Sequence, residues 1–185
     1  MHHAMRWEES MSAVFDDLEQ QAEGLHLMER DAEVAELTLA EYSRVTLGSR
    51  LHASLGQDVR VRLLGGRVVA GLLTRLGEDW LLLDDGTSEW VVRYPGLVAV
   101  SGLSTKAHSE DSWRVVDRLT LRAVLRRLAA AAELCQVHFC DDQQIEGRVG
   151  RVGRDFFELH VGEGADGIAQ AIPLTSVTAL QGRRG

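Results

Sequence analysis

The chain has 185 residues, of which 45% are hydrophobic and 26% charged, and its formal net charge is −8. This composition is sufficient for packed cores in one or two domains, and the lack of any 18-residue apolar run excludes a membrane-spanning helix. The N-terminus lacks the apolar segment of a signal peptide. Cys135 and Cys140 have no partner cluster that would make a zinc site, and we expect Cys135 to be a buried small hydrophobe. We therefore expect a cytoplasmic protein with no metal and no cofactor.

Residues 1–45 predict a long helix whose apolar side chains recur at alternating spacings of four and three. The apolar positions are Trp7, Met11, Val14, Leu18, Leu25, Met28, Ala32, Ala35, Leu39 and Tyr42, and Gln21 takes the one polar position. Such a heptad pattern is typical of a coiled-coil seam. The segment carries 11 acidic and three basic residues, whereas residues 46–185 hold 17 of each sign. Two interpretations stay open: the helix folds back along its own chain, or it pairs with a second copy.

The stretch from Val59 to Leu83 recurs 76 residues later. In both copies apolar residues alternate, which indicates half-buried strands, and paired Gly or Asp residues mark the first turn. Gly71 corresponds to Gly147 inside the second strand, where a glycine indicates a bulge or bend. Residues 92–102 recur at an offset of 80. Each repeat is predicted to be a helix, opened by Thr46-Leu47 or Thr120-Leu121, followed by about five strands.

This order resembles the Sm-like family, which includes bacterial Hfq. The resemblance is carried by the alternating first strand, the inner glycine and the Gly-x-Asp turn at Asp79 and Asp155. The resemblance implies two repeated small Sm-like barrels, each with a leading helix. With the long N-terminal helix predicted from the heptad pattern, the expected fold is α+β, mainly β. A generic SH3-like barrel is the alternative. Sm-like proteins assemble into rings through their last strands, but two barrels in one chain can pair internally, which predicts a monomer or homodimer.

The expected organisation has four parts. They are the acidic helix over residues 1–45, the first repeat over 46–103, a polar linker over 104–112 and the second repeat over 113–185.

The chain departs from the RNA-binding members of this family at their contact sites. Those members have an asparagine after the Asp turn, whereas Trp80 and Phe156 occupy that place here. Those members also have a basic or histidine-bearing loop between their last two strands. At that loop only Arg93 and Tyr94 could do comparable work, and only in the first repeat. With Trp90 they form a candidate aromatic and basic patch, which suits either base stacking or a protein hot spot. We expect Trp80 to be buried.

The helix predicted from Trp113 to about Glu133 carries four arginines at spacings of four. They are Arg114, Arg118, Arg122 and Arg126. This spacing places them near one face of the helix, and three interpretations stay open: a solvated face, pairing with the acidic helix, or contact with nucleic acid. The apolar positions predicted as core are Val116, Leu119, Ala123, Leu128 and Ala132.

No pattern indicates catalysis. None of the histidines has metal-ligand spacing, and His138 and His160 alternate outward from their strands, which predicts surface positions. The serines lack a nucleophile elbow. The first hypothesis is therefore a non-enzymatic scaffold that binds protein partners, or a second copy, through its barrels and acidic helix. The second hypothesis is an RNA-binding Sm-like protein.

Overall fold

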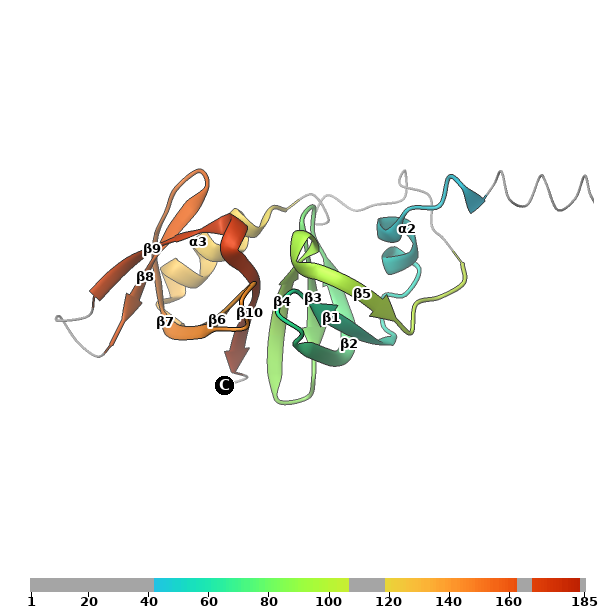
Figure 1. Ribbon diagram of the computed structural model, residues 1–185, viewed down its shortest axis with the longest axis horizontal. Coiled ribbons are helices and arrows are strands. Elements are labelled where there is room, and N and C mark those ends of the chain that lie inside the picture. The colour runs from blue at the N-terminus through green and yellow to red at the C-terminus, as the bar shows by residue number, and fades with distance from the viewer. Residues whose placement is uncertain (1–41, 107–118, 163–167, 184–185) are drawn as a thin grey trace, which may run out of the picture. The chain divides into compact units, whose positions relative to one another are not determined.

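The computed structural model describes residues 42–106, 119–162 and 168–183 (Figure 1). Apart from residues 42–45, the predicted acidic helix lies outside this part of the chain, as do Arg114, Arg118 and Val116. Met1–Val45 and Thr46–Gly185 form two separate units. Both sequence repeats belong to the second unit.

The two repeats have the same succession of elements. The first contains α2 (Leu47–His52), β1 (Asp58–Leu63), β2 (Val68–Leu76), β3 (Trp80–Asp84), β4 (Ser88–Arg93), the 3-10 helix η1 (Tyr94–Gly96) and β5 (Leu97–Ser101). The second contains α3 (Leu121–Ala131), β6 (Leu134–Phe139), β7 (Gln144–Val152), β8 (Phe156–Val161), β9 (Ile168–Pro173), the 3-10 helix η5 (Leu174–Ser176) and β10 (Val177–Arg183). β6, β7 and β8 begin 76 residues after β1, β2 and β3, and β9 and β10 begin 80 residues after β4 and β5. These are the two offsets found in the sequence.

The ten strands form one open sheet, in the order β5-β1-β2-β3-β4-β10-β6-β7-β8-β9, and every pairing is antiparallel. The predicted pair of small barrels is therefore wrong, because the described strands form one open sheet. β4 of the first repeat pairs with β10 of the second, so the sheet continues across both repeats. The physical reason is that edge strands carry unpaired backbone groups, which β4 and β10 satisfy in each other. Alternation within one repeat cannot predict this partner.

The second leading helix is shorter than the sequence predicts. α3 begins at Leu121, whose backbone N–H donates to Oδ1 of Asp79 at 2.7 Å, and Thr120 makes no side-chain cap bond. Two residues before the helix, the carbonyl of Leu119 accepts from Nε1 of Trp80 at 2.8 Å and from the N–H of Glu78 at 3.1 Å. The β2–β3 turn of the first repeat therefore fixes where the helix of the second repeat starts.

The side chains that α3 buries also differ from the prediction. Leu121 and Leu125 are fully buried, whereas Leu119 and Ala132, predicted as core, are exposed. Leu119 and Ala132 are exposed because they lie outside α3, whereas Leu128, also predicted as core, packs against the core of the second repeat.

Each repeat has a core to which the other repeat contributes. Ala179 of β10 belongs to the core of the first repeat. Trp80 of β3 belongs to that of the second, so its predicted burial is confirmed. Cys135 is buried as predicted, and burial raises the pKa of its thiol to about 11, with smaller contributions from Glu133 and Glu146. The cores interlock across the β4–β10 pairing, so each repeat buries side chains that separation of the two repeats would expose.

The inner glycines allow neighbouring strands to approach closely. A Cβ atom at Gly71 would lie 2.4 Å from the carbonyl oxygen of Asp84, and one at Gly147 would lie 2.6 Å from that of His160. No side chain fits at these distances, and the strand register shifts just after each glycine.

We predict that Gly71→Ala lowers the free energy of unfolding by about 1–3 kcal/mol, because the added methyl group displaces the backbone of β3. Urea denaturation measures this difference. Gly182→Ala in β10 is the matched control, since a Cβ atom there meets nothing within 4 Å. Equal stability of the two variants would contradict the close approach.

Candidate functional site

The contact between the repeats, which we call the joint, consists of the β4–β10 pairing and the side chains around it. Five residue pairs align β4 with β10, from Ala179 opposite Val92 to Arg183 opposite Ser88. Buried polar side chains gather there, namely Ser88, His138 and Thr178. Buried polar groups need hydrogen-bond partners, so these side chains determine how the joint is held.

Trp90, a residue predicted to contact a partner, lies inside the joint. Its side chain is 7% exposed, and its Nε1 donates to Oδ2 of Asp85 at 2.8 Å. Its ring lies 4.9 Å from that of His138 between centroids, at 32°. The indole therefore links the first repeat to the second and does not present an open face for stacking.

Asp85 organises the turn between β3 and β4. Oδ1 accepts from the N–H and hydroxyl of Thr87 at 2.8 Å each and from the N–H of Ser88 at 2.7 Å. Burial alone would raise the pKa of Asp85, but the hydrogen bonds from Trp90, Thr87 and Ser88 together lower that pKa to about 2. An ionised Asp85 thus holds Trp90 in place.

His138 corrects a prediction, because it is 1% exposed and not on the surface. Its Nε2 lies 3.3 Å from Oε1 of Gln181, whose Nε2 donates to Oγ of Ser88 at 3.1 Å. Nδ1 has no hydrogen-bond partner among the described residues. Burial lowers the pKa of His138, and the charge of Arg67 lowers it further.

The wrong prediction for His138 has a simple cause. Alternation correctly directs the side chain away from the core of its own repeat, but the opposite face of β6 meets the joint. The exposed position predicted for His160 is confirmed.

Arg93 and Tyr94, also predicted to contact a partner, make contacts within the fold. Nη1 of Arg93 donates to the carbonyl of Leu174 and, at 3.3 Å, to that of Val177. Burial lowers the pKa of Arg93, opposed by the charge of Asp79. Tyr94 packs against the core of the first repeat. Both residues thus lie where the chain passes from strand to 3-10 helix, and Arg93 binds the second repeat.

The arginines of α3 lie on a different element. Arg122 Nη1 donates to the carbonyl of Arg154 at 3.4 Å, and Arg126 is exposed. Arg127, next to it, is exposed as well. Of the seven predicted contact residues, the structure thus places Trp90 and Arg93 in the joint and Arg122 and Arg126 on α3.

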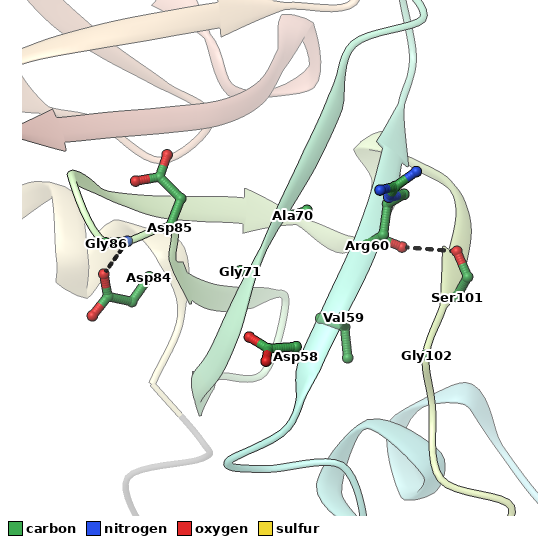
Figure 2. A pocket seen from close by; sticks show the side chains of 10 residues that line it. All are labelled: Asp58, Val59, Arg60, Ala70, Gly71, Asp84, Asp85, Gly86, Ser101 and Gly102. Atoms are coloured by element: carbon green, nitrogen blue, oxygen red, sulfur yellow. Dashed lines mark hydrogen bonds between the residues drawn. The ribbon is translucent and has the colours of Figure 1, made fainter.

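A shallow groove of about 710 Å³ crosses β5, β1 and β2 and reaches the β3–β4 turn (Figure 2). Its lining comprises Asp58, Val59, Arg60, Ala70, Gly71, Asp84, Asp85, Gly86, Ser101 and Gly102. Figure 2 shows Asp84 and Asp85 on one side and Arg60 with Ser101 on the other. Three carboxylates against one guanidinium make this groove suitable for a cationic side chain.

A second cavity, of about 730 Å³, lies between α3 and the β3–β4 face. Its apolar lining includes Trp80, Leu82, Val91, Val124 and Leu128, and its charged lining is Arg75, Glu89, Arg127 and Glu133. The sequence pattern did not indicate either cavity, since both depend on which strands become neighbours.

In residues 42–106, 119–162 and 168–183, no group of three or more His, Cys, Asp or Glu side chains is placed to hold a metal ion. No helix in this part of the chain is long and apolar enough to cross a membrane. No protein-family model matches the chain, and no curated protein matches it in sequence. The resemblance to the Sm-like family therefore stays a prediction.

We predict that Asp85→Asn lowers the free energy of unfolding at neutral pH by roughly 1 kcal/mol, since exposure to solvent screens much of the interaction. The folded-state pKa of about 2 lies below the ordinary value of 3.8. The stabilisation is therefore present above pH 3.8 and is lost as the pH falls towards 2. Urea denaturation across this range measures it.

Asp58→Asn is the matched control, because the Asp58 side chain accepts no hydrogen bond among the described residues although it lines the same groove. A pH-independent difference between Asp85→Asn and the unmodified chain would contradict the role of the carboxylate.

Proposed function

We propose that the chain is a non-enzymatic interaction protein that binds an extended segment of a protein partner at an open edge of its sheet. The observation that carries this proposal is that β5 and β9, the two edge strands, contain no charged residue. Proteins ordinarily protect sheet edges with charged side chains, proline or covering segments. Uncharged edges favour pairing with another strand.

Of the two edge strands, β5 is more suited to pairing with a strand of the partner. Its sequence LVAVS contains no proline, and Val98 at its centre is 50% exposed. β9 ends at Pro173, which has no N–H to donate. In strand addition, backbone hydrogen bonds supply affinity and side chains supply specificity. Val98 is the exposed residue at the centre of β5, so its side chain would contact the partner.

Charge near β5 favours a basic partner. The groove of Figure 2 includes Ser101 and Gly102 at the carboxyl end of β5, together with Asp58 and Asp84. A long basic side chain near the end of a peptide paired with β5 would reach these carboxylates by extending across the groove from Ser101. We therefore expect a segment with a β-branched centre and a Lys or Arg near one end.

Residues 1–45 remain a second predicted contact surface, for a partner or for another copy. The compartment, which we expect to be the cytoplasm, is part of the same proposal. The monomeric or homodimeric state is an expectation that light scattering of the full chain measures.

The test is a selection of random unstructured peptides, displayed on phage, against the full chain. We predict that selected peptides bind with slower amide exchange in β5, and that Val98→Lys weakens their affinity at least tenfold, or about 1.4 kcal/mol. Val68→Lys is the matched control, since Val68 is 53% exposed but lies on β2, between β1 and β3. Equal losses in both variants, or recovery of no binding peptide, would contradict the proposal.

RNA binding is the second candidate, and the observation that favours it is the exposed pair Arg126 and Arg127 on α3, next to Arg122. A basic helical surface is an electrostatic footprint for phosphates. Fluorescence anisotropy with short U-rich and A-rich RNAs, at low and near-physiological salt, discriminates the two functions. Binding that survives the higher salt and is lost in Arg122→Gln/Arg126→Gln would favour RNA.

A further inference from the structure

His138 occupies a site in the joint that suits only its neutral form. The imidazole is 1% exposed. In the neutral form Nε2 donates to Gln181, and Nδ1 is left without a partner among the described residues. A protonated ring would carry a second N–H donor at Nδ1, and no acceptor is in place for it.

The charged groups around His138 come from both repeats. Arg67, from the β1–β2 turn, lowers the pKa of His138, whereas Asp142, from the β6–β7 turn, raises it. These two side chains approach each other to 3.4 Å, so each partly cancels the other. β4 contributes Ser88 and Trp90, and Trp90 in turn binds the carboxylate of Asp85. β10 contributes the neutral side chains of Gln181 and Thr178, the latter bonded to the His138 carbonyl.

We propose that His138 makes the joint sensitive to pH: protonation of its ring opens the β4–β10 pairing while each repeat keeps its own strands paired. The buried charge gains water only if β4 moves away from β10, because these strands carry the side chains that cover it. Opening also presents the backbone edges of β4 and β10, which are unavailable in the closed sheet.

The direction of the pH dependence follows from burial. The pKa of His138 in the closed joint lies below its ordinary value of 6.5. The closed joint is therefore fully stable above that value and loses stability as the pH falls below it. One proton changes the opening equilibrium by at most about tenfold per pH unit.

The experiment is hydrogen–deuterium exchange of the full chain at about pH 7.5 and about pH 5.5, corrected for the intrinsic exchange rate. We expect faster exchange at the lower pH in peptides from β4 and β10, by several-fold, and little change in β1, β2 and β7. His138→Gln should abolish the difference. His160→Gln, which removes an exposed histidine, should behave as the unmodified chain does.

A second variant keeps the test independent of how well His138→Gln folds. Arg67→Gln removes a nearby positive charge from a partly exposed side chain, which moves the pKa of His138 in the closed joint back towards its ordinary value. Because acid opens the joint only as far as that pKa is lowered by closure, the difference in exchange between the two pH values should become smaller. The proposal is overturned if His138→Gln keeps the pH dependence, if Arg67→Gln leaves the size of the pH-dependent difference unchanged or enlarges it, or if exchange rises equally in all strands.

Discussion

The pairing of β4 with β10 is the contact on which the rest of the structure depends. It joins two five-stranded halves into one sheet and covers backbone groups that would otherwise form two further edges. It also brings Ala179 into the first core, and Trp90 against His138. The start of α3 depends on the same arrangement, because Asp79 of the first repeat caps it. Backbone pairing, core packing and helix capping thus all cross the joint.

The two repeats differ where they contact each other. Leu82, half-buried beside α3, corresponds to Glu158, which receives hydrogen bonds from Arg151 at 2.6 and 2.9 Å. Trp90 corresponds to Gln170, and Arg93, which binds carbonyls of the second repeat, corresponds to Pro173. The face of β8 and β9 is therefore suited to solvent, whereas that of β3 and β4 is suited to the second repeat. The side-chain contacts that secure the joint are absent from the counterpart positions on β9, which favours a joint made once within each chain.

Sequence periodicity predicted what depends on a single repeat. The offsets of 76 and 80, the buried Cys135 and the helix start at Leu47 all follow from local alternation and capping chemistry. The positions of His138 and Arg93 could not be predicted in this way, because a face that points away from one core can be covered by the other repeat. The residues that differ between the aligned repeats did indicate these positions. Arg93 aligns with Pro173, for example, which indicates that this site has a different environment in each repeat.

The measurement that tests this account most directly is hydrogen exchange of the full chain at neutral pH over a series of urea concentrations. If the joint makes the two repeats one cooperative unit, peptides from β1–β2 and from β6–β7 become exchangeable at the same urea concentration. Two well-separated transitions, with one repeat open while the other stays protected, would contradict the account.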